Sequence, residues 1–372
     1  MKHETTPPIA RPADPQNRFD AVYRILDDAI AARAFPGCAF GVLAGGSIVL
    51  QDALGRFTYE ENAPIVAADT VFDVASITKV AATTAAAMLL HQRGMVNLET
   101  PLGTLLPSFL ASREAGDPVR LVTLRHLLAH NSGLPGHVDF FRTATTAPAL
   151  FEALLKLPLE TAPGVRAEYS DPGFMLLGKA LEVCLGEPLA PWIQREVFAP
   201  LGMTATGFCP AIASRRSIPP TEEDTWFRHR RIQGEVQDEN AWILGGAAGH
   251  AGLFSNVPDL LRFAGEVVTA AGQVGGSRLF GAATIERFAQ RQGPEGSSWA
   301  LGWDTPSGDS TSGHFFSPHT IGHLGFSGCS LWIDLEGDVA VVLLTNRTWT
   351  DRKCQLIREV RPAFHDAVRS SL

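Results

Sequence analysis

The chain has 372 residues and a formal net charge of −8, and 45% of its residues are apolar. This length allows one large domain or two smaller ones, and the apolar share allows a sizeable core, so disorder is not the default. The acidic balance argues against an electrostatic surface for nucleic acid, and we expect no nucleic-acid partner.

Several features bear on where the protein works. Residues 1–17 are rich in proline and polar side chains and hold no apolar segment like that of a secretory signal, so we predict a disordered leader. The longest apolar run, Val80–Leu90, is too short to cross a membrane, and no membrane partner is expected. The five cysteines are odd in number and scattered, which suggests neither a disulfide framework nor a zinc site. We therefore expect a cytoplasmic protein.

The first elements after this leader predict one helix and one hairpin. Apolar residues recur at helical spacing over Arg18–Ala34, and Pro36-Gly37 stops the helix. Two short apolar runs then follow, Cys38–Ala44 and Ser47–Ala53, and Gly45-Gly46 between them is typical of a β-hairpin.

The middle of the chain is predicted to be mostly helical. From about Leu98 to Met203 the pattern gives short helices separated by proline and glycine, the first of them capped by Thr123 and ending near Gly133. Further helices are expected at Ala147–Leu157, Pro172–Leu185 and Pro188–Phe198. Gly202–Asn240 is polar and turn-rich, and we interpret it as a long surface loop.

The last third returns to strands. After a glycine-rich turn at Gly245–Gly252, helices are predicted at Pro258–Ala271, Ala282–Gln290 and Asp351–Leu372. Strands are predicted at Trp299–Asp304, Thr320–Phe326, Cys329–Asp334 and Val339–Thr345.

Strands therefore lie at both ends of the sequence, with helices between them. The predicted fold is α+β, an antiparallel β-sheet flanked by the terminal helices, with a mostly helical region inserted between its strands. We assign residues 18–75 and 245–372 to a discontinuous sheet domain and residues 76–244 to the helical domain. The cleft between them is the natural place for a site.

A Ser-x-x-Lys pair, Ser76 and Lys79, opens the predicted helix that Gly94 closes. Residues three apart on a helix are neighbours, with Cβ atoms roughly 5–6 Å apart, so the hydroxyl and the amine share one face. A serine hydroxyl needs a partner that takes its proton, and a lysine that burial deprives of its charge can do so. The pair is equally compatible with a helix cap and a solvated lysine. However, the apolar flanks predict a buried helix, in which a lysine needs a role.

Two other stretches carry candidate residues. In Tyr169-Ser170-Asp171, a tyrosine beside a lysine ammonium is stabilised as a phenolate and can take or relay a proton. Alternatively, Tyr169 is simply half-buried and Ser170 or Asp171 caps the next helix. Gly322–Phe326 lies on a predicted strand, and its glycines suit either a bulge or a close approach of another backbone. A strand edge beside the nucleophile could supply an N–H for an oxyanion hole.

Other chemical motifs are weak. His126 and His130 are four residues apart, but no HExxH motif accompanies them, so we expect no metal site. The absence of a G-x-S-x-G motif weakens an α/β-hydrolase interpretation. His250, in the glycine-rich turn, could line a pocket, although a structural role in the turn is the simpler interpretation.

Together these motifs resemble those of the serine β-lactamase and penicillin-binding-protein family, especially its class C β-lactamase and esterase branch. Ser76-Ile77-Thr78-Lys79 is similar to the first family motif, and Tyr169-Ser170-Asp171 to its Tyr-x-Asn motif. His323-Leu324-Gly325 resembles the Lys-Thr-Gly motif, in the His-x-Gly form seen in the esterase branch. The resemblance runs from roughly Phe19 to Val368 and includes the segments Leu124–Gly136 and Pro200–Phe208.

The resemblance implies a mechanism. Ser76 would attack a carbonyl and form an acyl-enzyme, which water then hydrolyses, and Lys79 and Tyr169 would share the proton transfers. Which of the two is the general base is left open by the sequence. The backbone N–H groups of Ser76 and Phe326 would form the oxyanion hole, and His323 would help to place the substrate.

Two departures from the family pattern bear on the substrate. Asp171 replaces an asparagine, so an amide donor becomes a negatively charged acceptor, and His323 replaces a lysine and is mostly neutral near pH 7. Both changes lower the positive charge that would hold the carboxylate of a β-lactam or a peptide. We therefore expect Asp171, His323 and Gly325 to line a site for a carboxylic ester or a small amide, with weak β-lactam turnover.

Other interpretations remain. A β-lactamase or a peptidase acting on D-amino-acid substrates uses the same residues, and a binding protein could keep the fold without the reaction. A metal-dependent hydrolase is a distant alternative. The resemblance implies no cofactor, and the sequence leaves the natural substrate and the oligomeric state undetermined.

Overall fold

The computed structural model of the protein describes residues 18–372 except for residues 112, 273–275 and 309. The predicted leader, residues 1–17, lies outside the described residues. Among the helices that are described, none is long and apolar enough to cross a lipid bilayer.

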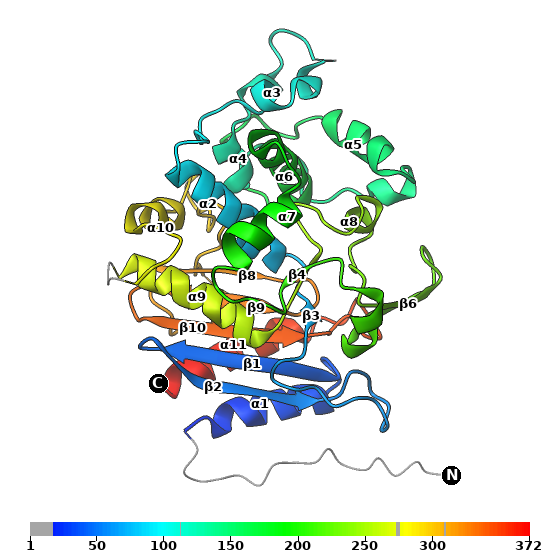
Figure 1. The fold of residues 1–372 in the computed structure, drawn as a ribbon, viewed down its shortest axis with the longest axis vertical. Coiled ribbons are helices and arrows are strands. Elements are labelled where there is room, and N and C mark those ends of the chain that lie inside the picture. Colours follow the sequence, from blue (N-terminus) through cyan, green and yellow to red (C-terminus); the bar gives the residue numbers. More distant parts are fainter. Residues whose placement is uncertain (1–17, 112, 273–275, 309) are drawn as a thin grey trace.

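A five-stranded antiparallel sheet forms the base of the molecule, with the strand order β2-β1-β10-β9-β8 (Figure 1). The strands are β1 Gly37–Ala44, β2 Ser47–Gly55, β8 Thr320–Leu324, β9 Ser330–Asp334 and β10 Val339–Thr345. The N-terminal hairpin therefore pairs with the last strand of the chain. The predicted α+β class, with an antiparallel sheet built from both ends of the sequence, is confirmed.

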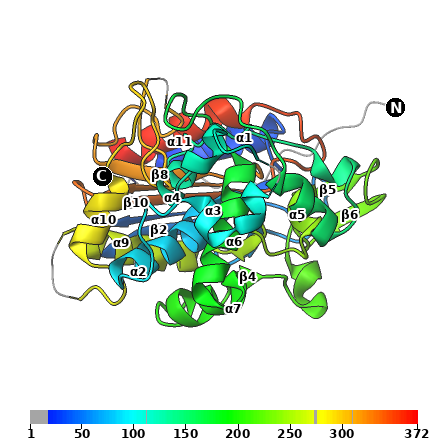
Figure 2. The same cartoon turned by 90° about the horizontal axis from the view of Figure 1, so that it is seen from above.

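The sheet is covered by helices on both faces (Figure 2). Alternate residues of its central strands point to opposite sides. Phe40 and Val341 pack with α1 (Asp20–Ala31) and α11 (Ile357–Ser370). The residues next to them in these strands point to the other face of the sheet and belong to the larger core. Helix α9 (Val257–Ala271) covers that face. Both faces of the central strands are buried, which explains why these strands read as continuous apolar runs.

The helical part of the chain stands on the α9 side of the sheet (Figures 1 and 2). Its α-helices are α2 Ala85–Gln92, α3 Leu102–Leu105, α4 Leu124–Leu128, α5 Ala147–Leu155, α6 Asp171–Leu185, α7 Leu189–Ile193, α8 Glu239–Ile243 and α10 Ala282–Ala289. Short strands β3 Phe72–Asp73, β7 Leu253–Ser255 and β4 Gly207–Phe208 join in a small second sheet. Most predicted helices are present, and Thr123 caps α4 as expected.

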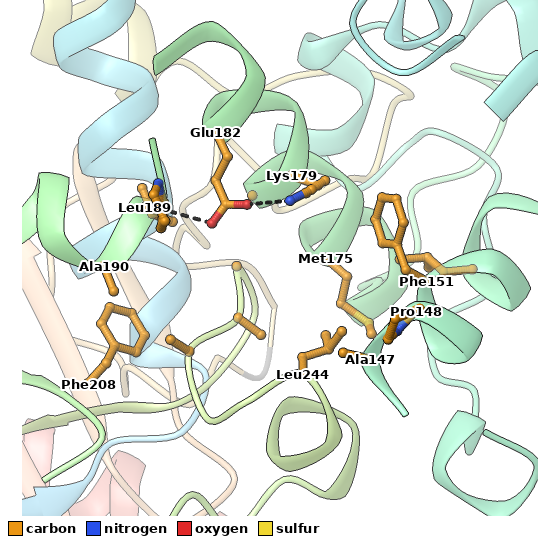
Figure 3. Close-up of a pocket in the computed structure, with 16 residues that line it drawn as sticks. Ala147, Pro148, Phe151, Met175, Lys179, Glu182, Leu189, Ala190, Phe208 and Leu244 are labelled. Carbon is orange, nitrogen blue, oxygen red and sulfur yellow. Dashed lines mark hydrogen bonds and ion pairs between the residues drawn. The ribbon is translucent and has the colours of Figure 1, made fainter. Parts of the chain in front are cut away.

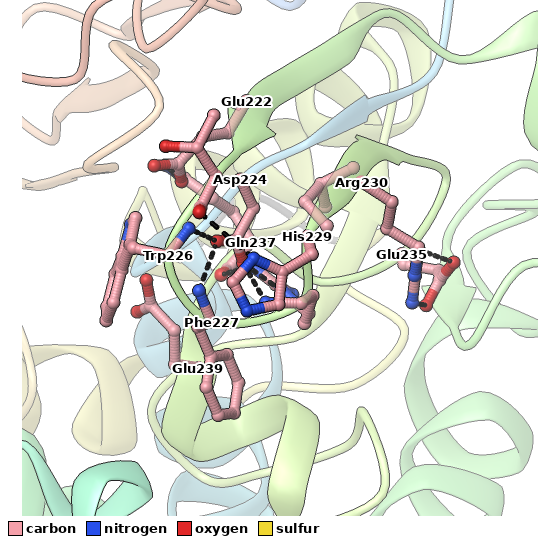
Figure 4. A network of polar contacts seen from close by, with 12 residues as sticks. Glu222, Asp224, Trp226, Phe227, His229, Arg230, Glu235, Gln237 and Glu239 are labelled. Atoms are coloured by element: carbon pink, nitrogen blue, oxygen red, sulfur yellow. Dashed lines mark hydrogen bonds and ion pairs between the residues drawn. The ribbon is translucent and has the colours of Figure 1, made fainter.

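The predicted loop over Gly202–Asn240 is wrong in part, because it contains a hairpin. Strand β5 (Pro220–Asp224) pairs with β6 (Arg230–Gln233). Apolar and polar residues do not alternate in this part of the sequence, because a polar network and not an apolar face holds the hairpin (Figure 4). Asp224 accepts hydrogen bonds from the backbone of the turn and forms a buried ion pair with Arg228 (2.9 Å).

Two further boundaries differ from the prediction. Trp299–Asp304 is not a strand: it makes only isolated bridges, because Gly302 turns the chain at a φ of 85°. The last helix begins at Ile357 and not at Asp351. The residues before it instead place Arg352 in ion pairs with Glu222 and Glu239.

A buried arginine joins α11 to the turn that follows β8. Arg361 is 6% exposed, and its guanidinium donates to the carbonyl oxygens of Gly325 (2.6 Å), Cys329 (2.7 Å) and Gly328 (3.2 Å). The carbonyl oxygens of Gly325 and Cys329 also accept backbone N–H groups, from Gly328 and Gly325, so the arginine is their second donor, whereas for the carbonyl of Gly328 it is the donor that replaces water. The turn between β8 and β9 is therefore fixed by a side chain from the end of the chain.

We expect Arg361→Leu to lower the free energy of unfolding by roughly 1–3 kcal/mol, because the carbonyl group of Gly328 loses its donor and those of Gly325 and Cys329 each keep only one backbone donor. Urea denaturation followed by circular dichroism would measure the change. Arg358→Leu, an exposed position on the same helix, is the matched control. Equal effects of the two substitutions would contradict the assigned role of Arg361.

Candidate active site

Ser76 lies in a sharp turn between β3 and the following helix. The carboxylate of Asp73 accepts hydrogen bonds from the backbone N–H groups of Ala75 (2.8 Å) and Gln237 (2.8 Å). Ala75 has a φ of 47°, a conformation that residues with a side chain adopt rarely and that often marks a functional site. The hydroxyl of Thr78 ties the turn to β7, since it accepts from the N–H of Leu253 (3.0 Å). The turn that carries Ser76 is thus braced from several sides.

Lys79 is directed back at Ser76 from the first turn of the helix. Its Nζ donates to Ser76 Oγ at 3.0 Å, as the i, i+3 spacing predicts. The predicted single helix is in fact a π-helical stretch, Lys79–Thr84, that continues into α2. Lys79 is fully buried, and its other donors reach Asp171 Oδ1 (2.7 Å) and the carbonyl oxygen of His250 (3.0 Å). All hydrogens of the ammonium group therefore have acceptors.

Tyr169 and Asp171, at the start of α6, contact Ser76 and Lys79 respectively. The Tyr169 hydroxyl donates to Ser76 Oγ at 2.6 Å. Between them, Ser170 caps α6 by accepting from the N–H of Gly173 (3.1 Å) and donates its own N–H to the ring of His130 (2.9 Å). Both interpretations of this motif therefore hold in part, because Ser170 is a helix cap while Tyr169 contacts Ser76 and Asp171 contacts Lys79.

The Lys79–Asp171 pair is charged. Burial lowers the pKa of Lys79, and the attraction of Asp171 opposes that shift. Burial also raises the pKa of Asp171, but Lys79 and then the hydrogen bond from His137 outweigh it and hold that pKa well below its usual range. A carboxylate in the first turn of α6 is further favoured by the helix dipole. The ionised Asp171 and the three hydrogen-bond acceptors around Lys79 Nζ fit an ammonium paired with a carboxylate.

Tyr169 keeps its proton. Burial, followed by the negative charge of Asp171, raises the pKa of this phenol well above its usual value. The expected phenolate beside Lys79 therefore does not form near neutral pH. The negative charge of Asp171 opposes the stabilisation that the lysine ammonium would give to a phenolate.

The end of β8 lies against the segment that precedes Ser76. A Cβ atom on Gly325 would lie only 2.5 Å from the carbonyl oxygen of Val74, so the two backbones touch there. The hydroxyl of Ser327 adds a hydrogen bond to the carbonyl oxygen of Asp73 (2.8 Å). The strand glycine therefore marks a close approach of backbones. Within the described residues, the N–H groups of Ser76 and Phe326 donate no hydrogen bond, so both remain available to a ligand.

His323 is buried and neutral. Burial lowers its pKa to about 3. Its Nδ1 lies 2.8 Å from the carbonyl oxygen of Leu324 and so carries the proton, while Nε2 has no partner among the described residues. The ring packs near Tyr169 and Trp299, with centroids 5.8 and 5.9 Å away. The predicted neutral state is supported, and the side chain offers an acceptor and no charge.

Sequence reasoning missed two contacts of the site. His250 was interpreted as part of a turn, yet its carbonyl oxygen holds Lys79, and its ring contacts Asp238 (3.0 Å). His137 was not singled out, and it lies 3.3 Å from Asp171 Oδ2. Neither residue belongs to a local motif, so only the three-dimensional contacts identify them. Among the described residues, no cluster of His, Cys, Asp or Glu is arranged to hold a metal ion.

An apolar cavity is present whose lining does not include Ser76 (Figure 3). Its volume is about 490 Å³, and it is lined mainly by apolar side chains of α5, α6 and α7, including Phe151, Met175 and Leu189. It reaches Gly249, next to the carbonyl that holds Lys79, but none of the predicted site residues lines it. The candidate active site is therefore defined by the contacts around Ser76 and not by this cavity.

Comparison with known proteins agrees with this geometry. A family model described as "Beta-lactamase" matches residues 22–361. A relative from Salmonella paratyphi B, named "Putative D-alanyl-D-alanine carboxypeptidase", is 29% identical over 89% of this chain and 81% of its own length.

Solved structures show the same fold at low identity. EstCE1, described as a hydrolase with promiscuous acyltransferase activity, is 22% identical with a TM-score of 0.76, over 95% of this chain and 98% of its own. A penicillin-binding protein homologue from Pyrococcus abyssi is 20% identical with a TM-score of 0.68, over 87% of this chain and 72% of its own.

The chain belongs to the beta-lactamase family and is a serine hydrolase. The predicted membership of the serine β-lactamase and penicillin-binding-protein family is thereby confirmed.

We expect Gly325→Ala to lower kcat/KM for an ester substrate by about tenfold to a thousandfold, the scale of losing one oxyanion donor, because the new methyl group pushes β8 away from Val74. Gly116→Ala, where a Cβ meets nothing within 4 Å, is the control. Steady-state kinetics on folded variants would measure the effect, and an unchanged rate would show that this backbone approach is dispensable.

Proposed function

We propose that the protein hydrolyses a carboxylic ester or a small amide through an acyl-enzyme on Ser76. The observation that carries this proposal is the environment of Ser76 Oγ, which accepts hydrogen bonds from the buried Lys79 (3.0 Å) and the half-buried Tyr169 (2.6 Å). Such a pair of donors stabilises a serine alkoxide, the reactive form of this nucleophile. The intact set also argues against an inactive binding protein.

Lys79 is the better general base of the two candidates. Its pKa is lowered by burial while that of Tyr169 is raised, so the lysine loses its proton first as the pH rises. Neutral Lys79 takes the proton of Ser76 while the serine oxygen attacks the carbonyl carbon. The carbonyl oxygen becomes an oxyanion, and the free N–H groups of Ser76 and Phe326 receive it.

Tyr169 is suited to the opposite task. Because the phenol stays protonated, it can give its proton to the leaving oxygen or nitrogen when the tetrahedral intermediate collapses. The proton that Lys79 took from Ser76 then restores the phenol. In the second half-reaction a water molecule loses its proton to the same groups, attacks the acyl carbon and releases the acid and Ser76.

The charges around Ser76 favour a substrate without a carboxylate. Asp171 is ionised and His323 is neutral, so neither residue attracts the carboxylate of a β-lactam or of a peptide C-terminus. An uncharged ester or amide has no carboxylate and so does not need a positively charged partner in the site. This is why we prefer an ester or small amide over a penicillin.

Two exposed aromatic rings, one of them on Phe326, whose N–H is an expected oxyanion donor, suggest an apolar or aromatic substituent on that substrate. Phe326 and Trp226 are 46% and 41% exposed, and the guanidinium of Arg352 lies 5.4 and 5.8 Å from their ring centroids. Arg352 is paired with Glu222 and Glu239, which lie close to Trp226 in Figure 4, so the charge of its guanidinium is offset by these carboxylates. Exposed aromatic rings held in place this way offer flat surface for a ligand.

A D-amino-acid peptidase is the second candidate. The relatives named as putative D-alanyl-D-alanine carboxypeptidases favour it, since they match 89% of this chain. The negative charge of Asp171 argues against it, because the substrate of such an enzyme ends in a carboxylate. Turnover of a peptide ending in D-Ala-D-Ala, compared with a neutral ester, separates the two.

We also propose that the protein works in the cytoplasm. None of the five cysteines forms a disulfide, and two of them, Cys38 and Cys329, are fully buried thiols. Such thiols suit a reducing compartment. Fractionation of cells that make the native protein would test this proposal.

A fluorophosphonate probe should add once to the intact protein and not to Ser76→Ala, because only an activated serine reacts. Intact-mass spectrometry would measure the adduct, and circular dichroism would show that the variant is folded. In the same preparations, neutral aryl esters should be hydrolysed with a higher kcat/KM than penicillin G. Absence of an adduct on the folded wild type would support the binding-protein alternative, and efficient penicillin hydrolysis would refute the substrate preference.

Tyr169→Phe should slow hydrolysis of an alkyl ester by about a hundredfold or more, the scale of a lost general acid. A p-nitrophenyl ester of the same acid should lose much less, because its leaving group departs without a proton. The ratio of the two kcat/KM values is the measurement. Tyr59→Phe, whose ring packs on Arg33, is the control. Equal losses for both esters would exclude Tyr169 as the proton donor.

A further inference from the structure

The hydrogen bonds around Asp171 continue to the protein surface. Asp171 Oδ1 binds Lys79 (2.7 Å), and its other oxygen, Oδ2, lies 3.3 Å from Nδ1 of His137. The second ring nitrogen of His137 lies 3.1 Å from Asp139, which in turn accepts from Nε of Arg142 (2.7 Å). Cations and carboxylates alternate along this row when His137 is protonated.

We propose that His137 is a positioning residue that shares the carboxylate of Asp171 with Lys79 and so weakens the hold of that carboxylate on the lysine ammonium. The proposal rests on the proposed function, in which Lys79 must lose its proton before it can activate Ser76. No motif of the family pattern stated above includes this position, and the role arises because an aspartate stands where that pattern has an asparagine. An amide at position 171 would have no charge to share.

The geometry supports a role in charge and not in packing. The His137 side chain is 54% exposed, whereas those of Asp171 and Lys79 are 15% and 0% exposed. His137 therefore adds little to the core, but it connects the solvent to the buried pair. Because each carboxylate oxygen of Asp171 has a different cationic partner, a change at one oxygen alters the charge that the other presents.

The charged groups facing His137 keep it protonated at neutral pH. Its hydrogen bond to Asp171, and more weakly those to Asp139 and the charge of Asp238, raise its pKa to about 9 although burial opposes them. Lys79 and Arg142 lie at the far sides of these carboxylates and are the positive charges of the row. Below about pH 9 the Asp171 carboxylate is thus shared by two cations, and above it by Lys79 alone.

The sign of the expected effect follows from this sharing. Loss of the charge on His137 leaves the full carboxylate to Lys79, so the ammonium is favoured and the pKa of Lys79 rises. Fewer molecules then hold the neutral lysine at a given pH, and Ser76 reacts more slowly. Loss of the charge on Asp171 has the opposite effect, because the buried lysine then gives up its proton at lower pH.

The experiment is the rate of fluorophosphonate labelling of Ser76 between pH 6 and pH 10, which requires no knowledge of the natural substrate. For His137→Gln we expect labelling to be roughly threefold to tenfold slower than wild type below pH 9, the scale of one nearby charge close to the surface. The two curves should converge above pH 9, where the wild-type imidazole is itself neutral. Asp171→Asn should shift the rising limb of the curve to lower pH.

Two further variants make the result specific. His137→Arg keeps a positive charge at all these pH values, so it should label like wild type below pH 9 and faster than His137→Gln above it. His319→Gln removes an exposed histidine elsewhere on the surface and should follow the wild-type curve. Thermal unfolding of each variant would confirm that it is folded.

The outcomes separate this proposal from the proposed function. If wild-type Ser76 labels but His137→Gln follows the His319→Gln curve, or is slower by the same factor at every pH, His137 does not act through charge and the proposal is wrong. If wild-type Ser76 does not label at all, the proposed function fails and the proposal fails with it. Both proposals are supported if the wild-type and His137→Gln curves converge near pH 9 while the His137→Arg curve stays above the His137→Gln curve.

Discussion

The need to satisfy one buried ammonium group organises the site. Lys79 is fully buried, so its charge must be matched inside the protein. Its acceptors come from three parts of the chain. Ser76 lies three residues before it, whereas Asp171, at the start of α6, and the carbonyl group of His250 are distant in sequence. The two helices and the glycine-rich turn must therefore converge on one atom. The arrangement that satisfies the lysine is the same one that places the tyrosine and the serine in contact.

Each segment that reaches this point is held by a local device of its own. Asp73 braces the turn before Ser76, Ser170 caps α6, and Arg361 holds the turn after β8 from the far side of the sheet. Gly325 lets that turn touch the backbone before the serine. None of these groups contacts Lys79. Rigid support of this kind keeps the reacting groups in place without using their own hydrogen-bonding capacity.

The sequence predicted those parts of the structure that depend on local patterns. Strand β10 was predicted with its observed bounds, Val339–Thr345, because a continuous apolar run describes a strand buried on both faces. The Ser76–Lys79 pair followed from helical spacing. In contrast, the β5–β6 hairpin was missed, since its strand residues Glu222 and Asp224 are buried in ion pairs and hydrogen bonds that no local pattern shows. His137 was missed for the same reason, because its partner Asp171 is far away in sequence.

The carboxylate at position 171, where the family pattern has an amide, changes both the charge and the hydrogen-bonding capacity of the site. An asparagine there could donate a hydrogen bond to a substrate oxygen, whereas Asp171 can only accept, and both of its oxygens are already engaged within the protein. On our proposal, the carboxylate at this position controls the charge state of Lys79 and does not bind the substrate. Recognition of the substrate must then come from other groups. The exposed ring of Phe326 is a candidate, because it belongs to the residue whose free N–H we expect to bind the oxyanion. On this proposal, charge control is the task of Asp171, and substrate recognition is left to other groups around Ser76.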